Sequence, residues 1–176
     1  YGHRPIQVGI GLHGGPAMLG IIGERMRLES TVISDTVNLA SRIENLTKFY
    51  HSDVLLSGEL VERLGDEPAY DFRLIDRVTV KGKSAASDLY ELVSAKPEGE
   101  RPLYRATLAD FNRGIALFKE GSFNEAVAAF KAVLTHNPRD LVTRVYLSRC
   151  EKALAGRKQE AIGGRTKLDA AFGTCS

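Results

Sequence analysis

Two polar side chains, Asn38 and Arg42, stand four residues apart in the segment STVISDTVNLASRIENL, residues 30–46. In an α-helix this spacing places both side chains on one side, one turn apart. A planar guanidinium beside an amide suits a ligand that combines an anionic group with a ribose or another hydroxyl. The same pattern also fits a solvated helix flank, and spacing alone favours that plainer interpretation.

The helix that carries this pair is predicted to begin near residue 35. Either Ser34 or Asp35 can cap it, because both side chains accept hydrogen bonds from the free backbone N–H groups of a first turn. The predicted buried face is a stripe at helical spacing, made of Leu39, Ile43, Leu46 and Tyr50. Asn38 and Arg42 project from a flank about 100° away from this stripe.

A glycine-rich run, GIGLHG at residues 9–14, formally matches the dinucleotide-binding pattern G-x-G-x-x-G, and Glu29 lies 20 residues beyond its first glycine. Dinucleotide binding requires these glycines to open a helix whose N-terminus holds a pyrophosphate. Here a second β-like run follows, so we assign the glycines to a tight turn and to close sheet packing. His13 is interpreted as structural, since no second histidine or carboxylate lies at metal-ligand spacing.

Alternating and apolar runs predict strands on both sides of the polar helix. Two strands, 6–13 and 17–23, are expected around a Gly14-Gly15-Pro16 turn, followed later by a buried strand at 53–57 and a short helix at 58–65. Segments 70–80 and 87–93 alternate well enough to pair as antiparallel strands. Strands interleaved with helices and closed by a hairpin predict an α+β layer.

After the charged segment SAKPEGERP the pattern becomes helical, and we assign residues 96–104 to a linker. A 34-residue helix–turn–helix pattern follows at the spacings of a tetratricopeptide repeat (TPR), on Gly114, Leu117, Gly121, Phe123, Ala126, Phe130 and Pro138. A further helix at about 141–156 would cover its open apolar face. This predicts a TPR-like all-α unit over 105–156, and a tail over 157–176 that is either disordered or a loosely docked helix.

The composition excludes several classes of protein. Twenty-four Lys and Arg against 22 Asp and Glu give a net charge of +2, too small to argue for nucleic acid. Cys150 and Cys175 are far apart, which argues against a zinc site or disulfide framework and favours a reducing compartment, the cytoplasm. No apolar run approaches the length of about 20 residues that spans a membrane. The chain opens almost directly on a strand, so we expect sequence upstream, which could attach a parent protein to a membrane.

Three separated blocks, in order, carry a family resemblance: VGIGLHGGPAMLGIIG (8–23), TVISDTVNLASRIE (31–44) and VTVKGKSAASDLYEL (78–92). Together they make residues 5–94 closely resemble the C-terminal half of a class III adenylyl/guanylyl cyclase catalytic domain. The resemblance implies a partial ferredoxin-like domain, an antiparallel sheet with helices, over residues 1–95.

The resemblance also implies roles for four residues. In the family, the ribose 3′-hydroxyl attacks the α-phosphate and pyrophosphate leaves. The asparagine matching Asn38 orients the ribose, and the arginine matching Arg42 stabilises charge on the pentavalent phosphorus. Thr31 occupies the base-selecting position, where threonine or aspartate goes with adenine. Lys81 matches the lysine that binds the triphosphate.

Other parts of the family site are absent from this sequence. The two metal-binding aspartates and the adenine-reading lysine lie in the N-terminal half of the domain, and no Asp-rich block replaces them here. Mg²⁺ or Mn²⁺ is therefore expected only in the complete enzyme, on ligands outside this chain. Cyclases commonly have glycine in place of Ser34, and threonine or serine in place of Gly14, but neither change removes a catalytic side chain.

Class III sites form at a dimer interface, so the expected partners are ATP and either a second copy or another cyclase half. We expect the chain alone to be inactive, as a fragment of an adenylate cyclase. The helical unit is a possible surface for a protein partner. The alternative is a degenerate cyclase-like module that regulates or scaffolds by binding protein through its helices.

Overall fold

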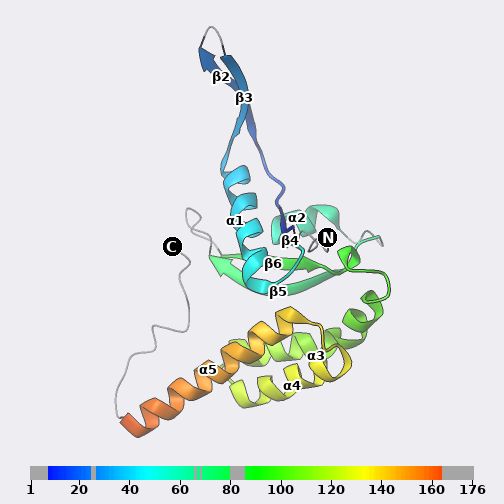
Figure 1. Cartoon of the computed structure of the whole chain (residues 1–176), viewed down its shortest axis with the longest axis vertical. Helices are drawn as coiled ribbons and strands as arrows, with labels where there is room; N and C mark the ends of the chain where they lie inside the picture. The colour runs from blue at the N-terminus through cyan, green and yellow to red at the C-terminus, as the bar shows by residue number, and fades with distance from the viewer. Residues whose placement is uncertain (1–7, 25–26, 66, 68, 80–85, 164–176) are drawn as a thin grey trace, which may run out of the picture. The chain divides into compact units, whose positions relative to one another are not determined.

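The computed structural model describes residues 8–24, 27–65, 67, 69–79 and 86–163. The chain divides into two compact units, Tyr1–Pro97 and Glu98–Ser176. Within the described residues, strands occur only in the first unit, and the second is built from helices (Figure 1). None of the described helices combines the length and the apolar character needed to cross a membrane.

The first unit is a mixed sheet with helices. Its elements are β1 (Ile10–Leu12), β2 (Met18–Glu24), β3 (Arg27–Ile33), α1 (Asp35–Tyr50), β4 (Val54–Ser57), α2 (Gly58–Leu64), β5 (Phe72–Thr79), β6 (Ala86–Leu92) and the 3₁₀ turn η1 (Val93–Ala95). Four strands form a sheet in the order β1-β4-β6-β5. β1 pairs with β4 in parallel, and the other neighbours are antiparallel. The predicted α+β class is confirmed, although the sheet is mixed rather than antiparallel throughout.

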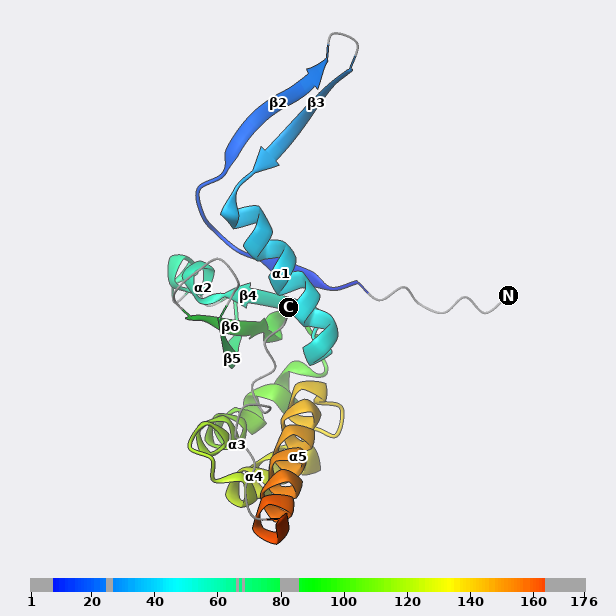
Figure 2. The ribbon, with the colours of Figure 1, turned by 90° about the vertical axis from the view of Figure 1, so that its left-hand side faces the viewer.

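The expected pairing of the first two strands around residues 14–16 is wrong. β2 pairs instead with β3, and Figures 1 and 2 show this hairpin standing apart from the four-stranded sheet. The loop after β1 is drawn toward the start of α1, where the Thr36 hydroxyl donates a hydrogen bond of 2.6 Å to the Pro16 carbonyl.

Gly11 of β1, and Gly9 just before this strand, allow close contact with α1 on one face of the sheet. A Cβ atom at Gly11 would lie 2.2 Å from the backbone nitrogen of Glu44, and one at Gly9 would lie 1.9 Å from the Thr47 hydroxyl oxygen. The next element after β1 is a strand, not a helix. The glycine pattern therefore serves strand-to-helix packing and does not open a helix, as the dinucleotide pattern requires.

The polar helix α1 forms where the sequence predicts it. The Ser34 hydroxyl accepts a hydrogen bond of 3.2 Å from the Val37 N–H group, which confirms the cap. The buried side chains are Leu39, Ile43, Thr47 and Tyr50. Thr47 takes the place predicted for Leu46, which is only half-buried. The bare Gly9 leaves room for the Thr47 side chain, whose hydroxyl donates to the Glu44 carbonyl at 2.6 Å.

A charged network lies inside the first unit. The Arg73 Nε group on β5 donates to Glu91 Oε2 on β6 at 3.1 Å, and Ser52 Oγ donates to Glu91 Oε1 at 2.7 Å. Lys96 Nζ lies 3.1 Å from the same Oε1 atom. Burial raises the pKa of Glu91, but the positive charges of Arg73 and Lys96 outweigh burial and hold it below its ordinary value.

The second unit contains α3 (Arg101–Lys119), α4 (Phe123–His136) and α5 (Leu141–Gly163). Gly114 lets α3 approach α4, since a Cβ atom there would lie 2.5 Å from the Phe130 ring. Gly121 adopts a left-handed φ of 79° between these helices, and α4 ends two residues before Pro138. The predicted helix–turn–helix and the third helix are therefore present.

The boundaries of the second unit differ from those expected. α3 begins at Arg101, inside the segment 96–104 assigned to a linker, because Pro102 is compatible with a first helical turn. α5 continues to Gly163 rather than ending near residue 156. The rest of the predicted tail, 164–176, lies outside the described residues.

Candidate functional site

Asn38 and Arg42 lie one turn apart on α1, and both residues are exposed. Their helix is fixed at both ends, by the Ser34 cap and by the left-handed His51, whose N–H group donates to the Thr47 carbonyl. Within the described part of the chain, no hydrogen bond or ion pair engages either side chain. An amide and a guanidinium are thus presented together on an ordered helix, available to an anionic ligand that bears hydroxyl groups.

The other two predicted site residues are placed less fully. Thr31 lies on β3 opposite Gly20 of β2, two residues before the end of the strand that leads into α1. Its side chain is outside what the structure describes. Lys81 falls among residues 80–85, between β5 and β6 in the sequence, and lies outside the described residues. The structure therefore brings Asn38 and Arg42 together and leaves the other two roles as predictions.

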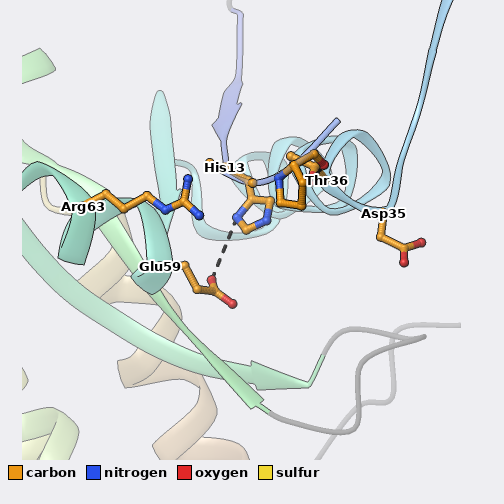
Figure 3. Close-up of a pocket in the computed structure, with 8 residues that line it drawn as sticks. His13, Asp35, Thr36, Glu59 and Arg63 are labelled. Carbon is orange, nitrogen blue, oxygen red and sulfur yellow. Dashed lines mark hydrogen bonds and ion pairs between the residues drawn. The ribbon is translucent and has the colours of Figure 1, made fainter. Parts of the chain in front are cut away.

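A cavity of about 280 Å³ opens beside the N-terminus of α1 (Figure 3). Its lining comes from the loop after β1, from α1 and from α2, and consists of His13, Gly14, Gly15, Pro16, Asp35, Thr36, Glu59 and Arg63. Two carboxylates and one guanidinium line the same space, so its charges favour neither an anion nor a cation. In the sequence, His13 is interpreted as structural, Asp35 as a possible helix cap and Gly14-Gly15-Pro16 as a turn, whereas nothing in the sequence points to Thr36, Glu59 or Arg63.

The His13 side chain is 5% exposed and joins two elements. Its Nδ1 atom lies 2.7 Å from Ser57 Oγ and 3.9 Å from a Glu59 carboxylate oxygen, the contact drawn in Figure 3. The Ser57 hydroxyl also accepts a hydrogen bond of 3.2 Å from the Leu60 N–H group and so caps α2. These contacts support the structural interpretation of His13, because it ties the end of β1 to the start of α2.

Among the side chains that the structure describes, no group of three or more His, Cys, Asp and Glu residues is arranged to hold a metal ion. The described residues therefore do not fit a divalent metal site. Cys150 is a free, buried thiol, and burial raises its pKa to about 11.

A sequence profile described as the adenylate and guanylate cyclase catalytic domain matches residues 2–94, more than half of the chain. The chain belongs to this cyclase family. The matched residues contain the exposed Asn38 and Arg42 pair and all of the strands described above.

Named cyclases show the same similarity. "Adenylate cyclase, terminal-differentiation specific" of Dictyostelium discoideum is 36% identical over 146 residues, which are 82% of this chain and 7% of that protein. The adenylate cyclase of Anabaena cylindrica is 47% identical over 88 residues, 49% of this chain and 18% of the relative. Retinal guanylyl cyclase 1 of Homo sapiens is 37% identical over 92 residues, 52% of this chain and 8% of the relative.

This cyclase chain spans less than a fifth of the length of each of these relatives. The match to the Dictyostelium protein has a further consequence. A match over 82% of the chain is longer than the first unit, so it necessarily extends beyond Pro97 into the helical unit. The similarity to that relative is therefore not confined to the cyclase domain.

Proposed function

We propose that this chain supplies one half of an adenylate cyclase site that is completed by a second cyclase chain. The observation that carries the proposal is the exposed pair of Asn38 and Arg42 on a helix capped at both ends. A pair that acts on a nucleotide held by another subunit has to be exposed in the isolated chain. Family membership supports the general reaction, conversion of a nucleoside triphosphate to a cyclic nucleotide and pyrophosphate, and we propose ATP as the substrate.

In this reaction the 3′-oxygen of ribose forms a new bond to the α-phosphorus, and the bond from that phosphorus to the leaving pyrophosphate oxygen breaks. Asn38 would hold the ribose by hydrogen bonds from its amide. Arg42 would stabilise the negative charge that gathers on the phosphorus oxygens, where preorganised positive charge acts most strongly. Lys81 would bind the triphosphate. A divalent cation would be held by residues of the other half of the site.

Adenine is the proposed base because Thr31 occupies the base-selecting position. Two of the relatives described above are named adenylate cyclases and one is a guanylyl cyclase. The proposal therefore rests on Thr31 for ATP rather than GTP. We place the protein in the cytoplasm, in keeping with the free thiol of Cys150.

The helical unit is proposed to be TPR-like and to bind a protein partner or to support the dimer. Its α3–α4 pair has the small residues and the glycine turn of such a repeat, and α5 covers the pair through the buried Val142, Tyr146 and Cys150. The Dictyostelium match that enters this unit supports a role alongside the cyclase domain. A scaffold without catalysis is the competing function.

Complementation tests the proposal. This chain is mixed with the Anabaena cyclase in which the asparagine and arginine matching Asn38 and Arg42 are both alanine, so that any active site must combine the two proteins. We expect cyclic AMP from the mixture with Mg-ATP, and none from either protein alone. Arg42→Ala in this chain should lower turnover about 100- to 1,000-fold, as loss of one preorganised charge-stabilising donor does elsewhere.

Asn45→Ala provides the matched control for Asn38→Ala, because Asn45 is also an exposed asparagine on α1. Turnover should fall with Asn38→Ala and stay near the unmodified value with Asn45→Ala. Equal turnover in the Asn38, Arg42 and Asn45 variants would leave only the scaffold function. Comparing ATP with GTP in the same mixture tests the role of Thr31.

A further inference from the structure

The C-terminal end of α1 is fastened to the β5–β6 hairpin by two side-chain hydrogen bonds. The Tyr50 hydroxyl donates to the Asp76 carboxylate on β5. Two residues after Tyr50, the Ser52 hydroxyl donates to Glu91 on β6 at 2.7 Å. Ser52 is 3% exposed and Glu91 is 1% exposed, so their contact is shielded from water. Tyr50 is 1% exposed but Asp76 is only half-buried, so the Tyr50–Asp76 contact is partly shielded. Hydrogen bonds made in a poorly solvated place are stronger than exposed ones.

A β-bulge places Asp76 where Tyr50 can reach it. Leu74 lies opposite Tyr90, but Asp76 lies opposite Leu89, so Ile75 is an extra residue in the strand. Leu89 and Tyr90 are neighbours and point to opposite faces of the sheet. Leu74 and Asp76 therefore also face opposite ways, although residues two apart share a face in a regular strand.

The face that receives Asp76 is the one covered by α1. Leu89 shares this face with Glu91, two residues further along β6. Glu91 pairs with Leu55 of β4, and Leu55 pairs with Gly11 of β1, so these residues lie on the same face of the sheet. Gly11 is the glycine that contacts the backbone of α1. Without the bulge, the side chain at 76 would lie on the face away from Tyr50.

The Asp76 carboxylate is held in a fixed orientation for this contact. Its second oxygen, Oδ1, accepts a hydrogen bond of 2.7 Å from the Arg77 N–H group. The Tyr50 ring packs edge-on against Phe49, with ring centres 4.9 Å apart. Donor and acceptor are thus both oriented before they meet, and the bond resists rotation of the helix end against β5.

From this geometry we propose that Tyr50 and Asp76 are positioning residues for the cyclase reaction. They fix the direction of α1, and with it Asn38 and Arg42, relative to β5 and β6, the strands on either side of Lys81 in the sequence. The inference rests on the proposed function, because it gives a catalytic purpose to the direction of α1. Neither Tyr50 nor Asp76 is proposed to touch the substrate.

Kinetics of the mixed enzyme described above test the proposal. Tyr50→Phe keeps the ring and removes only the hydroxyl. We expect kcat to fall about 10- to 100-fold with KM for ATP little changed, because a misplacement of about 1 Å lowers transition-state stabilisation more than ground-state binding. Asp76→Ala should match this loss. Asp76→Asn keeps an acceptor oxygen and should retain more activity.

Ser94→Ala is the matched control. The Ser94 hydroxyl accepts a hydrogen bond of 3.4 Å from the Asp71 N–H group beside the same hairpin and does not involve α1. This variant should retain kcat, while its melting temperature indicates what loss of one hydrogen bond does to stability. Equal kcat values in the Tyr50→Phe and Ser94→Ala variants would overturn the positioning role.

A distance measurement gives a readout that needs no turnover. Spin labels on cysteines at the exposed positions Ser41 and Arg77, in a Cys175→Ser background, report the distance between α1 and β5 in the chain itself. We expect Tyr50→Phe to broaden the distance distribution, and an unchanged distribution would overturn the proposal. An inactive wild-type mixture would overturn the proposed function, whereas an active mixture unaffected by Tyr50→Phe would overturn only the positioning role.

Discussion

The interior of the first unit contains an ion pair between two strands, whereas the interior of the second is mainly aromatic, with the buried Asp140 placed at the start of α5, where it accepts hydrogen bonds from Thr143. Arg73 and Glu91, each 1% exposed, form an ion pair between β5 and β6. In the helical unit Phe111, Phe130 and Tyr146 contact one another, with ring centres 5.5 to 6.5 Å apart. The stability of an ionic interior depends on the presence of every charged partner and on its protonation state, whereas the stability of an aromatic interior depends on how completely the side chains fill the available volume. The two units should therefore fail under different changes.

The largest expected effect comes from Glu91→Ala. Arg73 would lose its buried carboxylate partner, while Lys96 would keep its 3.1 Å contact with Asp53. Breaking a buried ion pair lowers the free energy of unfolding by about 3–5 kcal/mol. Hydrogen exchange measured by mass spectrometry should show loss of amide protection in β5 and β6, with protection kept in α3 and α4. Phe130→Ala, at about 3–5 kcal/mol, should give the reverse pattern. Loss of protection in both units with either variant would contradict the comparison.

A smaller effect is expected from adding one methyl group between β1 and α1. In Gly11→Ala the new Cβ would meet the backbone of Glu44 at 2.2 Å, and the overpacking should lower the free energy of unfolding by about 1–3 kcal/mol. Gly156→Ala in α5 is the control, because no atom lies within 4 Å of its Cβ position. It should stabilise the helical unit by up to about 1 kcal/mol. Urea denaturation measures the free energy of unfolding of both variants, and hydrogen exchange then shows in which unit the amide protection changes.

Lowering the pH should reduce the free energy of unfolding of the first unit by less than Glu91→Ala or Gly11→Ala does. The pKa of Glu91 is lowered in the folded chain, so its contribution is fully present above the unfolded value of about 4.3 and is lost as pH falls through the folded pKa. The effect is smaller than that of Glu91→Ala because a protonated carboxyl still fills its place. Urea midpoints between pH 7 and 3 should fall for the first unit, and Glu91→Gln should flatten that fall. An equally steep fall in Glu91→Gln would show that other groups govern the response.

Local signals predicted most elements of the chain. The Ser34 cap and the spacing of Leu39, Ile43 and Tyr50 define α1, and Gly121 and Pro138 mark the turns of the helical unit. The features that the sequence did not predict depend on contacts between residues far apart in the chain. The parallel pairing of β1 with β4 and the burial of Thr47 are set by contacts between segments far apart in the chain.

Two further features, the strand β3 and the bulge at Ile75, were not predicted for reasons that lie in the local sequence. The sequence pattern does not predict β3 because Arg27 and Glu29 interrupt the first half of RLESTVI. The β-branched run of Thr31, Val32 and Ile33 is nevertheless typical of a strand. The bulge at Ile75 has no signal in an alternating pattern, since it changes which residues share a face without changing their types. In the site, Asn38 and Arg42 were predictable as an exposed pair from helical spacing alone, but their roles came from the family.

The fastening of α1 at its far end also determines its mechanical behaviour. Arg42 precedes Tyr50 by eight residues, which is about 12 Å along the helix axis. A stiff helix that pivots at Tyr50 by about 5° would carry Arg42 sideways by about 1 Å, enough to matter for catalysis. On the role proposed for Arg42, a small rotation of the helix about Tyr50 would therefore change turnover. Whatever changes the angle at Tyr50 would tune the reaction without touching the nucleotide.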